Sequence, residues 1–264
     1  MTEQDIYPVK YIKSLRGAIA HVIQFSDGFN YVVKFDTKKE KREKELVNEY
    51  VVGQLATHLS LPTIPSRLVF IPEDFIKEVS SRKKLQPGYH YAILFIEESV
   101  TFPNKGDESS IGTVDNSEEE LAGIVVFDQW VNNTDRGRNN ILFKKLENSY
   151  YVYMIDHGRC FPGGYCWNSE TLKEEPQYRI KMPVYKWILS FVESQDQLYA
   201  FAEKIKEFSN ESIANIVQSI PEEWNATTSD KESLINYLIN EKENLSKVVD
   251  LIVEKYGKKI GAKR

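Results

Sequence analysis

The first third of the chain alternates apolar and polar residues with the two-residue period of β-strands. Four segments are predicted as strands: residues 18–25, 30–35, 66–71 and 89–96. The Ser26-Asp27-Gly28 sequence between the first two predicts a hairpin turn. Apolar residues recur at helical spacing over residues 43–59, and Pro62 and Pro65 predict the end of that helix. We therefore expect a β-rich region with one main helix.

The pattern changes in the middle of the chain. Residues 102–116 are rich in Gly, Ser, Asp and Asn, which predicts a linker or surface loop. Ser117 and Glu120 have the spacing of a capping box, so we expect a helix that starts there and runs into a loop at residues 132–135. A β-rich region is thus followed by a connector and a helix.

The remaining chain is mainly helical in pattern. Apolar runs at residues 141–143 and 151–155 predict one more hairpin. Further helices are predicted over residues 185–194, 195–208, 212–219 and 229–256. We expect an α+β fold with two lobes and a cleft between them. The β-rich N-lobe would span residues 1–97, and the largely helical C-lobe residues 98–264.

Composition places the chain among ordinary globular proteins, since 41% of its 264 residues are hydrophobic and 28% are charged. A net charge of −5 gives no overall attraction to nucleic acid or to an anionic membrane. The N-terminal sequence is too polar for a signal peptide, and no apolar run approaches the roughly 20 residues of a membrane span. We expect a cytoplasmic protein with no nucleic-acid or membrane partner.

The chain has two cysteines, Cys160 and Cys166, which are too few for a disulfide framework. Two reduced thiols in a loop are the plainer expectation, because the sequence offers no second pair of metal ligands. A disulfide between them, or a metal site completed by His157, is the alternative.

Three polar side chains around the second hairpin are difficult to explain by packing: Asp135, Asn140 and Asp156. If Leu142 lies opposite Met154, then Asn140 falls opposite Asp156 at the mouth of the hairpin. Two hard oxygen donors would then face each other, with the Asp135 carboxylate on the loop just upstream. Such an arrangement can hold Mg²⁺ and orient a hydroxyl toward a phosphate.

Two charged residues upstream share faces with apolar neighbours. Lys34 lies inside a predicted strand, and Glu49 lies on the apolar stripe of the predicted helix. Taken alone, Lys34 would more often be a snorkelling edge residue, and Glu49 could equally face solvent. A buried carboxylate needs a partner, however, and Lys34 is the obvious candidate. In phosphoryl transfer Lys34 would contact phosphates, while Glu49 would hold it in place.

The remaining roles follow from the same chemistry. Asn140 and Asp156 would bind Mg²⁺, and Asp135 would align the acceptor hydroxyl and take its proton. The order of a strand lysine, a helix glutamate, D-x₄-N and D-x-G resembles the protein-kinase-like superfamily. Four segments more narrowly resemble the HipA-like kinase family: Leu46-Val47-Asn48-Glu49, residues 127–136, Ile155-Asp156-His157-Gly158 and Ile220-Pro221-Glu222-Glu223-Trp224. The resemblance covers most of the chain.

The resemblance implies a bilobal kinase fold, ATP and Mg²⁺ as cofactors, and phosphoryl transfer to a serine or threonine of a protein. Carried over position by position, it implies these roles: catalytic base, Asp135; metal ligands, Asn140 and Asp156; ion pair, Lys34 and Glu49; hinge, Phe95, Ile96 and Glu97, whose backbone would meet adenine. Residues 159–178 are expected to shape the acceptor site.

The sequence departs from the superfamily pattern at the phosphate grip and around the catalytic loop. In place of a G-x-G-x-x-G loop it has one glycine, Gly17, which is expected to lie at the nucleotide, with Arg16 as an alternative phosphate contact. Asn133 replaces the usual histidine of the catalytic loop. His157 stands where phenylalanine is usual, and we expect a structural role for it rather than a pH sensor.

Four functions therefore remain open at this stage. A serine/threonine protein kinase is the first. A kinase of the same fold acting on a small hydroxyl compound is the second, and a nucleotide-binding pseudokinase or interaction module is the third. Nucleotidyl transfer, with ATP bound the other way round, is the fourth. The intact Lys34, Asp135, Asn140 and Asp156 argue for an enzyme.

Overall fold

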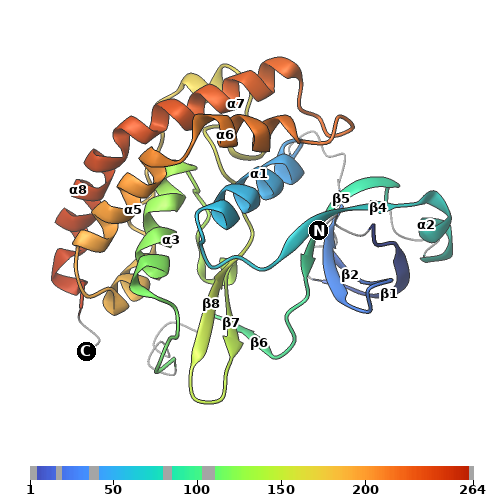
Figure 1. The fold of residues 1–264 in the computed structure, drawn as a ribbon, viewed down its shortest axis with the longest axis horizontal. Coiled ribbons are helices and arrows are strands. Elements are labelled where there is room, and N and C mark those ends of the chain that lie inside the picture. The colour runs from blue at the N-terminus through green and yellow to red at the C-terminus, as the bar shows by residue number, and fades with distance from the viewer. Residues whose placement is uncertain (1–4, 16–19, 36–41, 80–84, 103–110, 262–264) are drawn as a thin grey trace.

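The computed structural model describes residues 5–15, 20–35, 42–79, 85–102 and 111–261. A five-stranded antiparallel sheet of order β1-β2-β3-β5-β4 forms one end of the molecule (Figure 1). Its strands are β1 (Pro8–Ser14), β2 (Ala20–Phe25), β3 (Asn30–Lys34), β4 (Ser66–Ile71) and β5 (Gly88–Leu94). A second, three-stranded antiparallel sheet consists of β6 (Ser99–Thr101), β7 (Ile141–Lys145) and β8 (Tyr150–Met154).

The helices are α1 (Glu45–His58), α2 (Glu73–Val79), α3 (Glu118–Trp130), α4 (Pro183–Ile188), α5 (Asp196–Glu207), α6 (Asn210–Gln218), α7 (Thr228–Glu241) and α8 (Leu245–Tyr256). Apart from α2, which lies beside the five-stranded sheet, they occupy the other end of the molecule and the region between (Figure 1). The antiparallel sheet region followed by a helical part confirms the predicted α+β class. In the described parts of the chain, no helix has both the length and the apolar character needed to span a bilayer.

Two elements near the N-terminus were missed by the sequence analysis. Strand β1 is an edge strand whose pairing with β2 shifts twice, between Pro8 and Lys10 and between Tyr11 and Lys13. These irregularities break the alternation that would have revealed it, and most of its side chains are exposed. Helix α2 is only seven residues long and buries Phe75 alone. Both elements lack the sustained periodicity on which sequence prediction depends.

Helix α1 lies between the five-stranded sheet and the helical part (Figure 1). Eleven of its fourteen residues are buried, so it is surrounded by protein on most sides. Gly53 allows a close approach to the sheet, because a Cβ at this position would collide with the hydroxyl of Tyr91 on β5. The absence of a side chain at Gly53 therefore lets α1 pack tightly against β5.

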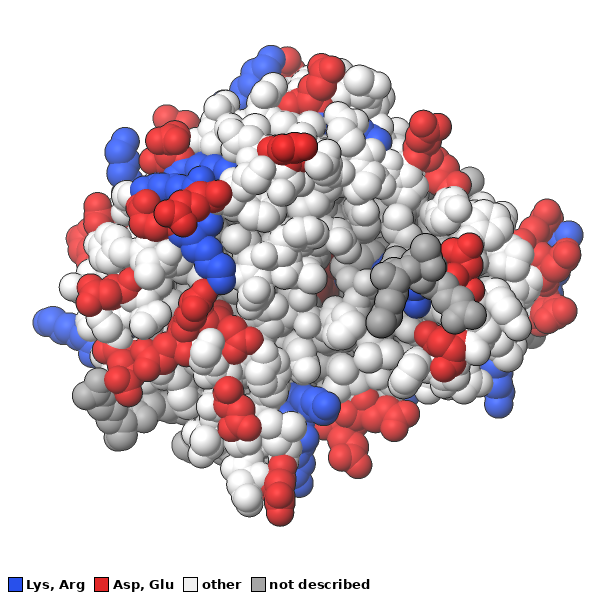
Figure 2. Space-filling model, in the orientation of Figure 1, with Lys and Arg blue, Asp and Glu red and all other residues white. Residues whose placement is uncertain are grey.

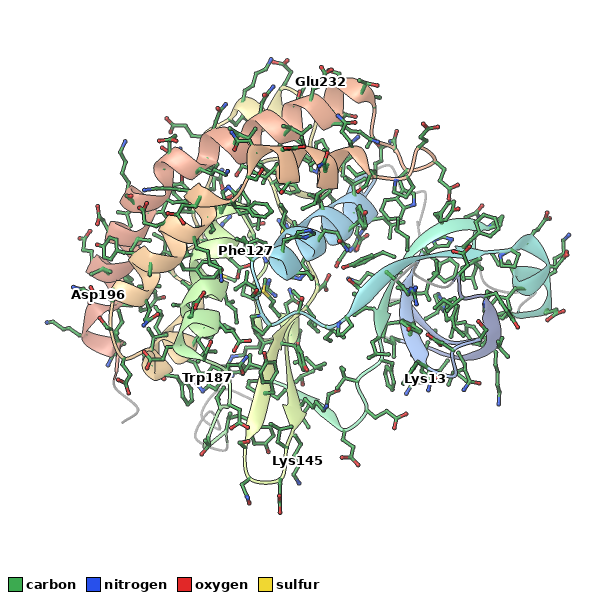
Figure 3. All side chains as sticks on the ribbon, in the orientation of Figure 1. Lys13, Phe127, Lys145, Trp187, Asp196 and Glu232 are labelled. Carbon is green, nitrogen blue, oxygen red and sulfur yellow. The ribbon has the colours of Figure 1, made fainter. Side chains whose placement is uncertain are left out.

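The hydrophobic core forms two clusters. The smaller one joins the sheet to Phe75 of α2, and the larger one runs from α1 through α3 into the C-terminal helices. Phe127 of α3 lies between α3 and α1, whereas Lys145 is at the far end of the β7–β8 hairpin (Figure 3). The lobe boundary at residues 97 and 98 stays a prediction, and α1, which precedes it, shares its core with helices that follow it.

The helical ends follow local chemistry. Ser117 accepts a hydrogen bond from the backbone of Glu120, whose side chain caps Ser117 in return, so the predicted capping box is confirmed.

The long helix predicted over residues 229–256 is instead divided by a 3₁₀ turn at Lys242–Asn244. Buried Lys242 is bonded there to the backbone of Phe208 and, at 2.8 Å, to Asn210. These tertiary bonds lie at the point where the two helices separate.

Candidate active site

The predicted pairing of Lys34 with Glu49 is present in the structure. Lys34 ends β3 and forms an ion pair with Glu49 of α1, whose carboxylate is fully buried. The same Lys34 Nζ lies 3.1 Å from Oδ1 of Asp156, which follows β8. One lysine therefore joins the five-stranded sheet, α1 and the segment after β8.

Mutual attraction sets the charges of these three groups. Burial alone would lower the pKa of Lys34, but Glu49 and Asp156 raise it above its usual value. Burial would likewise raise the pKa of Asp156, and Lys34 instead holds it well below its usual range. Glu49 differs, because its complete burial outweighs the attraction of Lys34 and raises its pKa to about 7. The site thus holds a charged lysine and a charged Asp156 at neutral pH.

The β7–β8 hairpin brings Asn140 beside Asp156, but not in the predicted register. Ile141, rather than Leu142, lies opposite Met154, so the prediction was wrong by one residue. In the observed register the buried residues Ile141, Phe143, Val152 and Met154 pair with one another on one face. Asn140 consequently aligns with Ile155, whose backbone N–H donates to the Asn140 carbonyl at 3.1 Å.

Asp135 and Asn140 are in direct contact. The Asn140 side-chain amide donates to the backbone oxygen of Asp135 and lies 3.4 Å from the Asp135 carboxylate. Because the Asn140 nitrogen is used in this way, its side-chain oxygen is the atom left for a cation. The predicted base thus contacts Asn140, one of the two predicted metal ligands, and the other, Asp156, directly follows Ile155, whose N–H binds the Asn140 carbonyl.

Asp156 adopts a left-handed backbone conformation with φ of 60°. Such a conformation is uncommon for residues other than glycine and costs free energy, so the surrounding structure must hold it. The Asp156 side chain is nevertheless 47% exposed, in contrast to its ion-pair neighbours. With Asn140 it offers the hard oxygen donors that Mg²⁺ prefers, together with nucleotide phosphates and water. The residues present therefore fit Mg-ATP.

A fully buried ion pair, which the sequence analysis missed, supports the loop that carries Asp135. Arg136 binds the Asp128 carboxylate of α3 with two nitrogens, at 2.8 and 3.0 Å. It also donates at 2.7 Å to the carbonyls of Asn140 and Ile155. Burial would lower the pKa of Arg136, but Asp128 raises it. A single guanidinium thus fixes the predicted catalytic loop to the strand that leads to Asp156.

Asp128 is shared with further buried groups. It accepts hydrogen bonds from Asn133 at 2.9 Å and from Tyr185 at 3.0 Å. The Asn133 oxygen in turn accepts from the backbone N–H of Asp135 at 2.9 Å. Asn133, which replaces the usual histidine, therefore orients Asp135 through the backbone. Asp128 and Arg136 stand eight positions apart in the sequence, and the local pattern gives no signal that they pair.

His157 is buried, with Nδ1 3.2 Å from the Arg136 guanidinium. Burial, together with the nearby charge of Arg136, lowers the pKa of His157 well below its usual value. The imidazole is therefore neutral and packs structurally, as expected. Cys160 is buried and Cys166 exposed, and the two do not form a disulfide. Among the described residues, no group of three or more His, Cys, Asp or Glu side chains is arranged to hold a metal.

The other predicted nucleotide contacts are placed only in part. Ile96 and Glu97 lie in the segment between β5 and β6, which joins the two sheets, and the Ile96 carbonyl accepts from the Ser99 hydroxyl at 3.0 Å. Their contact with adenine stays a prediction. Gly17 and Arg16 lie outside the described residues.

A cavity of about 500 Å³ opens next to the catalytic loop. Thr134 and Asn132 line it on one side, and residues of the 159–179 segment, including Arg159 and Arg179, line the other. A second cavity of about 440 Å³ is lined in part by residues of α7. The two cavities share Glu174 and Glu175 in their walls. On the face shown in Figure 2, acidic and basic side chains are interspersed around a largely uncharged middle.

Comparison with solved structures defines the class of the fold as kinase-like. The crystal structure of the Helicobacter pylori proinflammatory kinase CtkA superposes with a TM-score of 0.61 at 18% identity, covering 97% of both chains. The Golgi casein kinase superposes with a TM-score of 0.55 at 11% identity, covering 98% of this chain and 77% of the other. At these identities the likeness concerns the fold alone.

The sequence profile of the HipA-like kinases matches residues 18–250. The chain therefore belongs to the HipA-like kinase family, as the sequence motifs predicted. No curated protein sequence matches it.

Proposed function

We propose that this protein is an ATP- and Mg²⁺-dependent serine/threonine protein kinase. The observation that carries the proposal is the contact of Lys34 with both Glu49 and Asp156, beside the Asp135–Asn140 pair. Bound Mg-ATP would supply the phosphoryl group. Lys34 would hold its phosphates, and Asn140 and Asp156 would hold the metal. Asp135 would orient the acceptor hydroxyl and accept its proton.

The two cavities favour a protein segment as acceptor over a small hydroxyl compound. One cavity lies beside Thr134 and the other beside α7, and Glu174 and Glu175 lie in the walls of both. Their walls carry charges of both signs, from Arg159 and Arg179 to the two glutamates. An extended peptide has the length to contact both cavities while its hydroxyl stays at Asp135.

Labelled ATP tests the proposal directly. Purified protein is incubated with cell lysate and ATP labelled at either the γ- or the α-phosphate, and Asp135→Ala serves as the matched control. We expect γ-label on a protein band, and a loss of about a hundredfold or more in Asp135→Ala, in line with removal of a positioned general base.

The other outcomes identify the alternatives. α-Label on protein indicates nucleotidyl transfer, and ATP consumption without labelled protein indicates a small acceptor. Nucleotide binding without turnover indicates a pseudokinase. Full activity in Asp135→Ala would refute the assignment of Asp135 as the base.

A further inference from the structure

Asn48 of α1 is completely buried and bound to the segment that follows Asp156. Its side-chain nitrogen lies 2.7 Å from the carbonyl of Gly158, 3.0 Å from that of Gly164 and 3.3 Å from that of Cys160. Its side-chain oxygen accepts from the indole N–H of Trp167 at 2.6 Å. One amide thus gathers four points of a ten-residue segment onto the helix.

These bonds lie directly beside the ion pair. Glu49, the residue after Asn48, is the partner of Lys34. The segment reaches the helix at Gly158, where a Cβ would stand 3.0 Å from Cγ of Glu45 and 3.2 Å from Oε1 of Glu49. A shift of α1 relative to this segment would therefore move the Glu49 carboxylate relative to Lys34.

A second contact holds the start of α1 to the same segment. The backbone N–H of Lys44 donates to the carbonyl of Tyr165 at 2.8 Å. The Lys44 ammonium lies 4.9 Å above the Trp167 ring and 2.8 Å from Asp230 at the start of α7. The helix is thus held at two successive turns, and the inner one, at Asn48, is adjacent to Glu49.

A purely apolar residue at position 48 would fill space but could not set this relation. Buried backbone carbonyls need donors, and leaving one unsatisfied is costly. Sharing the two hydrogens of the asparagine amide among the carbonyls of Gly158, Gly164 and, at the longer 3.3 Å, Cys160 requires α1 to sit at one height and rotation. Packing alone tolerates small shifts, whereas this set of bonds does not.

We propose that Asn48 is a positioning residue, which fixes α1 to residues 158–167 and thereby keeps Glu49 at Lys34 and Lys34 at Asp156. Its effect on catalysis rests on the proposed kinase function, whereas its effect on the position of Lys34 does not. The arrangement implies that α1 is held in its productive position by the segment itself.

Two matched substitutions test the proposal. In Asn48→Asp the side chain can still accept from Trp167 but can no longer donate to the three carbonyls. Asn116 provides the control, because it is also a buried asparagine that donates to one backbone carbonyl and accepts one backbone N–H, both of Val152, away from α1. Asn116→Asp therefore removes a buried donor in the same way without touching the ion pair.

The readout is the rate at which Lys34 is acetylated by an amine-reactive ester, measured by mass spectrometry on the folded protein. Lys34 is only 12% exposed and is paired with Glu49 and Asp156, so it should react slowly in the wild type. We expect Lys34 in Asn48→Asp to react several-fold faster, because loss of the Asn48 bonds lets Glu49 move away from Lys34 and leaves the amine more accessible. Asn116→Asp should react at the wild-type rate, because it leaves the contacts of α1 in place.

Activity gives the second readout, with kcat for ATP turnover expected to fall more in Asn48→Asp than in Asn116→Asp. Equal acetylation of Lys34 in the two variants would overturn the proposal. If Asn48→Asp does not fold, Trp167→Phe decides, because it removes the indole N–H bond to Asn48 and keeps an aromatic side chain. A rise in Lys34 labelling over the wild type supports the proposal, and no rise refutes it. A wild type without phosphotransfer would refute the kinase function, while Lys34 labelling would still decide the role of Asn48.

Discussion

Lys34 Nζ lies 3.1 Å from Oδ1 of Asp156 although the two residues are 122 positions apart in the sequence. Because Lys34 also pairs with Glu49, this contact links α1 to the segment that follows β8. The positive charge of Lys34 is thus shared by two carboxylates from distant parts of the chain.

Replacing Lys34 by methionine would leave Glu49 as a buried carboxylate without a counter-charge. One of its oxygens, Oε2, already has no hydrogen-bond partner. Removing one member of a buried pair costs about 3–5 kcal/mol, and we expect a smaller loss below pH 7, where Glu49 takes up a proton. Urea unfolding measures this loss. The double variant Lys34→Met/Glu49→Leu should regain much of the stability yet stay inactive, so recovered phosphotransfer would contradict the role of Lys34.

Asp156→Asn should weaken metal binding more than folding. An amide oxygen is a poorer ligand for Mg²⁺ than a carboxylate, and changes around a metal site typically cost 10–100-fold in affinity. We expect the Mg²⁺ concentration for half-maximal ATP turnover to rise about tenfold or more. Asp250 is an aspartate of α8 that is bonded to Tyr199 of α5, and Asp250→Asn should leave the Mg²⁺ titration unchanged. A superimposable titration for Asp156→Asn would exclude this residue as a ligand.

The buried pair Arg136/Asp128 should matter more for stability than an exposed pair of the same type. Arg136→Met leaves Asp128 unpaired and removes the donors to Asn140 and Ile155, with an expected loss of about 3–5 kcal/mol in urea unfolding. Lys204→Met breaks a pair with Glu119 whose side chains are 38% and 53% exposed, and should cost no more than about 1 kcal/mol. Similar losses for the two variants would contradict the supporting role of Arg136.

The residues with the strongest local signals were predictable. Lys34 stands inside the segment predicted as a strand and Glu49 on an apolar helix face, and both positions conflict with simple packing. The capping box at Ser117 fixed one helix start, because its chemistry is entirely local. Such features depend only on residues a few positions apart, which a sequence displays directly.

Features set by tertiary packing were not predictable in the same way. The hairpin register differs by one residue because the choice depends on which face the core buries. The break at Lys242 and the role of Arg136 depend on carbonyls contributed by distant segments. Asn48 belonged to a recognised motif, yet its partners at Gly158, Gly164 and Trp167 are visible only in the fold.

Gly53→Ala should destabilise the protein although alanine favours helices. The propensity gain is about 1 kcal/mol, but the new Cβ would collide with the Tyr91 hydroxyl, and overpacking typically costs about 1–3 kcal/mol. Tyr91→Phe removes the obstructing oxygen, together with its hydrogen bond to Ser66. We therefore expect the alanine substitution to be less harmful, or stabilising, in the Tyr91→Phe background. Additive effects in a double-mutant cycle would show that the two side chains do not meet.

The neutral state of His157 predicts a pH dependence of stability. Its pKa is lowered in the folded protein, so below pH 6.5 the unfolded chain takes up a proton that the folded protein excludes. Stability should therefore be complete above that pH and fall as the pH decreases, by up to about 1.4 kcal/mol for each pH unit. His157→Phe, which introduces the side chain usual in related motifs, removes this contribution.

Comparing the pH dependence of stability in the wild type and in His157→Phe isolates the contribution of His157. Glu49 acts in the opposite direction, because its raised pKa makes the folded state hold a proton up to about pH 7, but this contribution is common to both proteins. Between pH 6.5 and 5 we expect the wild type to lose about 2 kcal/mol more than His157→Phe in urea unfolding. Parallel pH profiles would mean that His157 takes up a proton in the folded protein, so that Arg136 does not face a neutral imidazole.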